Sequence, residues 1–227
     1  MTYTLHPVTS DDASDIAAIF QAAFAEGHIM RYFHPRVPAS VIWENDVRFI
    51  RGLIAQGDIY GERVTKAVDE DTGETVAFSA WQYPYTLTEE QRKEKEAQDR
   101  SAIDEPPEGS NNQFITDFCT QLFDGRKKWI VPEKTFFLHL LAVHPSHHRR
   151  GLGSMLIRPG LEAADEAGAQ TYVEASPAGL PLYLRHGWEQ VDGMAVDTRP
   201  YGGRGIEHKP FLMREPGAGS KLGKTEG

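Results

Sequence analysis

The chain has few of the features that mark secreted, membrane-spanning or nucleic-acid-binding proteins. It contains one cysteine, Cys119, among 227 residues, which excludes an internal disulfide and a cysteine-based zinc site. No apolar run approaches membrane-spanning length, and the first residues lack the apolar core of a secretory signal. The formal net charge of −9 argues against a general nucleic-acid-binding surface. We therefore expect a cytoplasmic protein with no nucleic-acid or membrane partner.

What the chain does have is enough apolar sequence for one globular domain, since 40% of its residues are hydrophobic. No linker divides it and no internal repeat is visible. We predict a single domain over residues 1–215 and a disordered tail at 216–227, because that segment is rich in glycine and lysine.

Apolar spacing predicts a mixed order of strands and helices. Tyr3 to Val8 alternates as a first strand, and stripes at helical spacing then begin at Ile16 and at Trp43. Ile59 to Val68 and Glu74 to Gln82 flank a polar turn, which predicts a hairpin.

The C-terminal third predicts three more strands, at Gln170 to Ala175, Trp188 to Val191 and Glu207 to Arg214. Pro210 lies in the last of these and cannot donate a ladder hydrogen bond, so we expect an edge strand or a bulge there. In the preceding helical pattern, Pro159 predicts a kink or an early break.

Residues 136–157 are the most informative stretch. Phe136 to Val143 is an apolar run interrupted only by His139, as expected of a buried central strand. Arg149 and Arg150 then lead into two glycines and a helical pattern. A glycine-containing turn that opens a helix directs backbone N–H groups at one point, which suits a phosphate or pyrophosphate.

Two other interpretations of this turn were weighed. A strand, turn and helix with glycines also occurs without any ligand, and the glycines alone favour that structural interpretation. His144, His147 and His148 could suggest a metal site, but no carboxylates cluster with them, and we expect no metal.

The segment His148-Arg-Arg-Gly-Leu-Gly153 resembles the acetyl-CoA-binding motif of the GNAT superfamily of N-acetyltransferases, Gln/Arg-x-x-Gly-x-Gly/Ala. His148 stands where the family usually has Gln or Arg. The resemblance implies an α/β (α+β) fold, in which helices flank a mixed central sheet of about six to seven strands. It also makes residues 84–133 an insertion before the central coenzyme-binding strand, either a lid or wall of the acceptor site or a surface decoration.

The resemblance further implies acetyl-CoA as cosubstrate. It assigns coenzyme contacts to the end of the central strand, to the turn, and to two later positions: Leu141, Ala142, Val143, His148, Arg149, Arg150, Gly151, Leu152, Gly153, Ser154, Ser176 and Tyr183.

Three side chains are candidates for proton transfer. Tyr183 lies in Leu182-Tyr-Leu-Arg-His-Gly-Trp188, which resembles the family's Leu-Tyr-x-x-x-Gly-Phe motif and implies an acid for the departing thiolate; the alternative is a core residue of a short helix. His139 matches the second histidine of a pair in arylalkylamine N-acetyltransferases, while Phe137 replaces the first. An imidazole suits a base, but a satisfied core histidine is an equal alternative, and Glu174 is the competing base.

We therefore expect an acetyl-CoA-dependent N-acetyltransferase that acts on a primary amine of a small molecule by direct attack in a ternary complex. A protein lysine or N-terminal amine is the alternative acceptor, and a non-catalytic acyl-CoA-binding domain is the alternative class. We expect a monomer or a homodimer.

Overall fold

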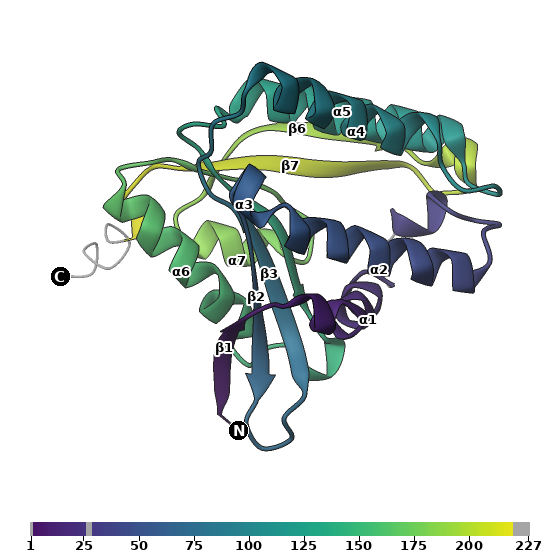
Figure 1. The fold of residues 1–227 in the computed structure, drawn as a ribbon. Helices are drawn as coiled ribbons and strands as arrows, with labels where there is room; N and C mark the ends of the chain where they lie inside the picture. The colour runs from purple at the N-terminus through teal and green to yellow at the C-terminus, as the bar shows by residue number, and fades with distance from the viewer. Residues whose placement is uncertain (1, 26–28, 220–227) are drawn as a thin grey trace.

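A computed structural model describes residues 2–25 and 29–219, which are organised around one seven-stranded mixed sheet (Figure 1). The strands are β1 (Tyr3–Pro7), β2 (Glu62–Asp69), β3 (Thr75–Gln82), β4 (Phe136–Val143), β5 (Thr171–Glu174), β6 (Glu189–Asp197) and β7 (Ile206–Arg214). Their spatial order is β1-β2-β3-β4-β5-β7-β6. Only β4 and β5 pair in parallel; every other neighbouring pair is antiparallel. The expected mixed sheet flanked by helices is confirmed.

Helices cover both faces of this sheet. They are α1 (Ala13–Phe24), α2 (Ala39–Ala55), α3 (Gly57–Tyr60), α4 (Glu89–Asp104), α5 (Asn112–Trp129), α6 (Leu152–Glu166) and α7 (Leu180–Arg185), with short 3-10 helices η1 (Ser10–Asp12), η2 (Met30–Tyr32), η3 (Pro145–His147) and η4 (Arg199–Tyr201). No helix within the described part of the chain is long and apolar enough to cross a membrane.

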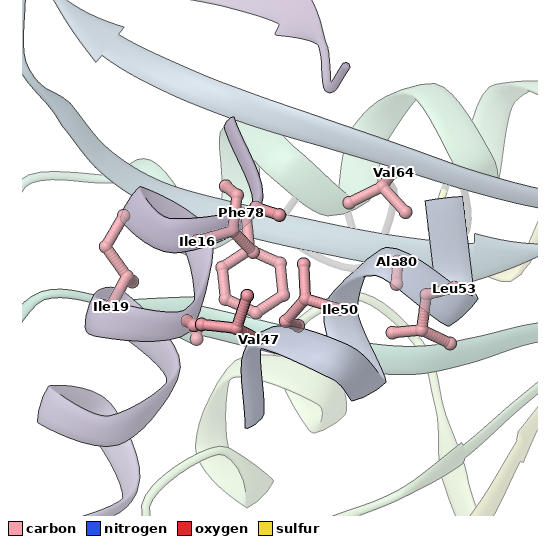
Figure 2. Close-up of a cluster of buried hydrophobic side chains, with 11 residues drawn as sticks. Ile16, Ile19, Val47, Ile50, Leu53, Val64, Phe78 and Ala80 are labelled. Atoms are coloured by element: carbon pink, nitrogen blue, oxygen red, sulfur yellow. The ribbon is translucent and has the colours of Figure 1, made fainter. Parts of the chain in front are cut away.

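The N-terminal half of one sheet face packs under α1 and α2. Figure 2 shows Phe78 of β3 between Ile16 of α1 and Val47 and Ile50 of α2. Phe78, Ile16 and Ile50 are fully buried. Burying a side chain of this size stabilises the fold by roughly 1.5–3 kcal/mol, so this cluster fixes both helices on β2, β3 and β4.

The C-terminal half of the same face packs under the insertion, whose residues form α4 and α5. The two helices run side by side across β6 and β7 (Figure 1). Phe114 and Phe118 of α5 pack with Tyr172 of β5 and Phe211 of β7. A Cβ at Gly125 would meet the Phe211 ring at 2.3 Å, so glycine is required for α5 to approach the sheet this closely.

The opposite face packs under α6 and α7. Leu138 of β4 lies in one cluster with Ile157 of α6 and with Trp188, which follows α7. The predicted early break at Pro159 is wrong, because α6 continues through it to Glu166. Pro159 itself is exposed, while Gly160 beside it is buried so close to the sheet that a Cβ would meet the Trp81 ring at 2.3 Å. Packing on the buried side therefore outweighs the hydrogen bond that proline cannot donate.

Two expectations for the C-terminal segment need correction. Pro210 does not lie on an edge strand, because β7 is paired with both β5 and β6. The register shift lies on β6 between Gln190 and Asp192, one pair away from Pro210. Of the tail expected to be disordered, 216–219 form a turn in which the Gly217 N–H donates to Asp165 at 2.7 Å; residues 220–227 lie outside the described residues.

Candidate active site

The sheet opens between its two parallel strands. β4 and β5 are paired only over Phe136–Leu138 and Thr171–Val173. Beyond Leu138, β4 continues to Val143 with pairing to β3 alone. The backbone edge of β4 at Leu141, Ala142 and Val143 therefore faces a gap, where its N–H and C=O groups can bond an extended ligand.

A bulge places His139 at the point where the gap begins. Ala80 pairs with Leu140 and Trp81 with Leu138, so His139 is the extra residue on β4. A bulge re-aims the local side chains. His139 stacks on Phe137 at 5.2 Å and meets the ring of Phe49 of α2 edge-on at 6.4 Å. Its side chain is 20% exposed, so it reaches solvent from a largely buried position.

Glu62 holds the imidazole of His139. Its carboxylate Oε1 lies 3.2 Å from Nδ1 of His139, and its side chain is only 3% exposed. A carboxylate on Nδ1 favours the tautomer that leaves Nε2 unprotonated. The pair is thus arranged so that Nε2 can take a proton while the carboxylate stabilises the resulting imidazolium.

Glu174, the competing base, has a different environment. Arg126 of α5 donates from Nε to Oε1 at 2.7 Å and from Nη2 to Oε2 at 2.9 Å. The Glu174 side chain is 6% exposed. The carboxylate raises the pKa of Arg126 against the opposing effect of burial, so the guanidinium stays charged. Both oxygens of Glu174 are therefore engaged by a permanent cation, so neither is turned towards a substrate.

The turn before α6 is the candidate phosphate cradle. Gly151 caps the helix at φ +83°, and Arg149 just before it is the one non-glycine among the described residues with positive φ, at +60°. The N–H groups of Leu152, Gly153 and Ser154 occupy the first turn, where no helical carbonyl reaches them. These N–H groups lie at the N-terminus of a fifteen-residue helix, where the helix dipole is positive. This end of the helix suits a bound phosphate.

Side chains around the turn are partly engaged with the protein itself. His148 donates from Nε2 to the carbonyl of Val143 at 3.0 Å, so it closes the turn. Arg150 donates to the hydroxyl of Tyr3 at 3.0 Å, whereas the side chain of Ser154 lies 3.0 Å from Nε2 of His186. Backbone groups, rather than these side chains, therefore make up most of the cradle.

Tyr183 lies in α7, which packs against the first turn of α6: a Cβ at Gly153 would meet the Leu182 side chain at 2.8 Å. It is buried at 6% exposure and packs edge-on against Trp188 at 5.6 Å. No described residue forms a hydrogen bond with its hydroxyl, and burial raises its pKa above the ordinary phenol value. Ser176 accepts the N–H of Gly179 at 3.1 Å, so its hydroxyl orders the turn that leads into α7.

Sequence reasoning missed Glu62 and Arg126. Glu62 shares the inward-facing register of Val64 in β2, and an acidic residue at such a position is a usable signal. Arg126 gave no such signal, because a basic residue near the end of a helix is ordinary.

One family model matches the part of the chain that contains the candidate site. The model of the Acetyltransferase (GNAT) family matches residues 118–188, a range that contains β4, the cradle and α7. Residues 118–188, which make up less than a third of the chain, are therefore similar to this family of acetyltransferases.

Solved structures share the fold along almost the whole chain. An agmatine N-acetyltransferase, a mutant in its apo form, has a TM-score of 0.63 at 15% identity and covers 94% of this chain and 99% of its own. A polyamine N-acetyltransferase from Drosophila melanogaster has a TM-score of 0.60 at 17% identity, covering 93% and 98%. The protein yncA from Salmonella typhimurium, solved with its cofactor acetyl-CoA, has a TM-score of 0.54 at 14% identity, covering 95% and 94%.

Proposed function

We propose that the protein transfers an acetyl group from acetyl-CoA to a primary amine of a small molecule, by direct attack in a ternary complex. The observation that carries this proposal is the His139–Glu62 pair, which lies where β4 and β5 separate. The agmatine and polyamine acetyltransferases of similar fold act on small amines by name.

The coenzyme has a place that fits its parts. The N–H groups at the start of α6 would hold the pyrophosphate, and the free edge of β4 would bond the pantetheine arm. Because β4 leads directly into η3 and α6, both contacts lie on one continuous segment. We expect a coenzyme bound in this way to present its thioester to His139 and Tyr183.

The chemistry follows from these positions. The neutral amine nitrogen attacks the thioester carbonyl carbon, and its proton passes to Nε2 of His139, directly or through one water. The carbon–sulfur bond then breaks, and the hydroxyl of Tyr183 protonates the departing thiolate. The raised pKa of Tyr183 keeps this proton in place until the thiolate forms. The products are the acetylated amine and free CoA.

The insertion supports a small acceptor. It contacts the α1–α2 half of the molecule at two separated points: Asn111 donates to the carbonyl of Phe33 at 2.9 Å, and Gln56 donates to Gln98 at 3.4 Å. These contacts make α4 and α5 a wall beside α2, on the sheet face that carries His139. A walled site admits a small amine more readily than a lysine on a folded protein surface.

Thiol release from acetyl-CoA across a panel of amines tests the proposal. We expect release with small primary amines and little with lysine-containing or free N-terminal peptides. Faster thiol release with the peptides would show that the acceptor is a protein amine and not a small molecule. Binding of CoA without release for any amine would contradict the enzyme and favour an acyl-CoA-binding domain.

A further inference from the structure

A hollow of about 510 Å³ adjoins the His139–Glu62 pair. It lies where β2 begins and β3 ends, next to α3, and its lining includes Asp58, Glu62, Tyr83 and Tyr85. Glu62 is therefore shared between the pair and the hollow. None of the steps proposed above uses this space.

Glu62 has an unused hydrogen-bond acceptor. Its Oε1 is engaged by His139, and no described residue donates a hydrogen bond to Oε2. A carboxylate whose side chain is 97% buried needs donors to offset the loss of water. Because Glu62 lines the hollow, a donor placed there would satisfy it.

The region around Tyr85 is electrically negative. Burial, together with the nearby Asp99, Glu62, Tyr60 and Glu133, raises the pKa of Tyr85 to about 12. Tyr60 meets Tyr85 edge-on at 6.0 Å, and its pKa is raised by burial and by Glu94 and Asp99. The nearby carboxylates that oppose ionisation of Tyr60 and Tyr85 also attract a cation.

Two tyrosine rings near the hollow already make cation–π contacts with basic side chains of the protein. The guanidinium of Arg63 lies 3.9 Å from the centre of the Tyr83 ring, and the ammonium of Lys95 lies 5.6 Å from that of Tyr60. Two carboxylates line the hollow, those of Asp58 and Glu62, against the single guanidinium of Arg63. Glu133 and Asp99, the latter paired with Lys95 at 3.3 Å, add negative charge near Tyr85. A further organic cation fits this combination of aromatic faces and excess negative charge.

We propose that this hollow binds a second cationic group of the acceptor, an ammonium or a guanidinium, beside the amine that is acetylated. The second group donates to Oε2 of Glu62 and contacts Tyr85, while the reacting amine lies at Nε2 of His139. The acceptor is then a small diamine or a guanidino-amine. This inference rests on the proposed function, since it names the acceptor class of the same site.

The test compares amines that differ only in the second cation. Thiol release is measured with putrescine, agmatine and n-butylamine. We expect kcat/KM for putrescine and agmatine to exceed that for n-butylamine by about tenfold or more, the effect of one well-placed charge interaction. Equal values for all three amines would overturn the subsite and leave the acetyltransferase intact.

Two variants locate the effect. Asp58→Asn removes an exposed charge and Tyr85→Phe removes one hydroxyl, so both keep the fold. We expect each to raise KM for putrescine by about three- to tenfold with KM for n-butylamine unchanged. Glu166→Gln, which removes an exposed charge from α6 on the opposite face, is the matched control and should change neither. An equal change for both amines in Asp58→Asn and Tyr85→Phe would contradict the proposal.

Calorimetry separates the two proposals. Putrescine and n-butylamine are titrated into the complex of the protein with CoA, which needs no turnover. Tighter binding of putrescine that is weakened in Asp58→Asn supports the subsite even where no thiol is released. Equal binding of both amines overturns it, whatever the result of the release assay.

Discussion

Glu62 and Glu174 are two nearly buried carboxylates on the same face of the sheet, one on each side of the opening between β4 and β5. Glu62 contacts His139, whose imidazole carries no permanent charge. Glu174 is held at both oxygens by Arg126, which is always charged. Similar burial thus accompanies different contacts: in the proposed mechanism Glu62 positions the base, whereas Glu174 joins α5 to the sheet.

Because their partners differ, loss of the Glu62 charge should mainly affect activity, and loss of the Glu174 charge should mainly affect stability. Loss of the Glu62 charge leaves a neutral imidazole, which is tolerated when buried. Loss of the Glu174 charge leaves an unpaired guanidinium, which is costly. Each of the following predictions tests one side of this contrast.

His139→Ala should have the largest effect. We expect kcat to fall by about a thousandfold, because general base catalysis typically contributes 10²–10⁴-fold. Initial rates of thiol release at neutral pH measure it. His6→Ala, which removes an exposed histidine from β1, is the control and should retain full activity. If kcat of His139→Ala stayed within threefold of the original value, His139 would be a packing residue and not the base.

Glu174→Gln should destabilise the protein by about 3–5 kcal/mol, because it leaves the Arg126 guanidinium without its carboxylate. Glu62→Gln should cost about 1 kcal/mol or less, since the amide can keep a hydrogen bond to His139. Denaturant unfolding of both variants measures the two values side by side. Equal losses of unfolding free energy would remove the contrast between the two carboxylates.

Tyr183→Phe should lower kcat by about a hundredfold with CoA affinity retained, because only the proton for the thiolate is lost. Burial raises the pKa of Tyr183, so the phenol stays protonated as pH rises and should add no basic limb to the rate profile through mildly alkaline pH. Tyr201→Phe, in η4, is the matched control. Unchanged turnover in Tyr183→Phe would remove the acid role.

Glu62→Gln should have the smallest effect on activity, a fall in kcat of about tenfold. The amide still positions the ring but no longer stabilises the imidazolium by its charge. Its KM for n-butylamine should stay within twofold, because Glu62 does not contact the reacting amine. A larger loss of rate than in His139→Ala would make Glu62 itself the base.

The strand, turn and helix of the proposed coenzyme segment could be predicted from the sequence because they are local. The strand, the turn and the helix from Phe136 to Glu166 are contiguous, and their apolar run, proline and glycines each have a direct backbone consequence. The hairpin of β2 and β3 was readable for the same reason. Its first strand was predicted too long, since Gly57–Tyr60 forms α3 instead.

The acceptor half could not be read in this way. His139 and Glu62 are 77 residues apart, and Arg126 and Glu174 are 48 apart. Such contacts depend on strand order and on the bulge at His139, which no local pattern specifies. Pro159 was misjudged for a similar reason, because the contact of Gly160 with Trp81 holds α6 in place from outside the helix.

The pH dependence of kcat/KM for thiol release, in the original protein and in His139→Ala, tests the central claim most directly. Protonation of the amine substrate at low pH lowers kcat/KM equally in both proteins. The difference between the two pH profiles therefore reports the contribution of the His139 side chain. A histidine base must be unprotonated, and the original enzyme should therefore lose activity towards acidic pH. The account predicts that this acidic limb disappears in His139→Ala. An unchanged limb would contradict it.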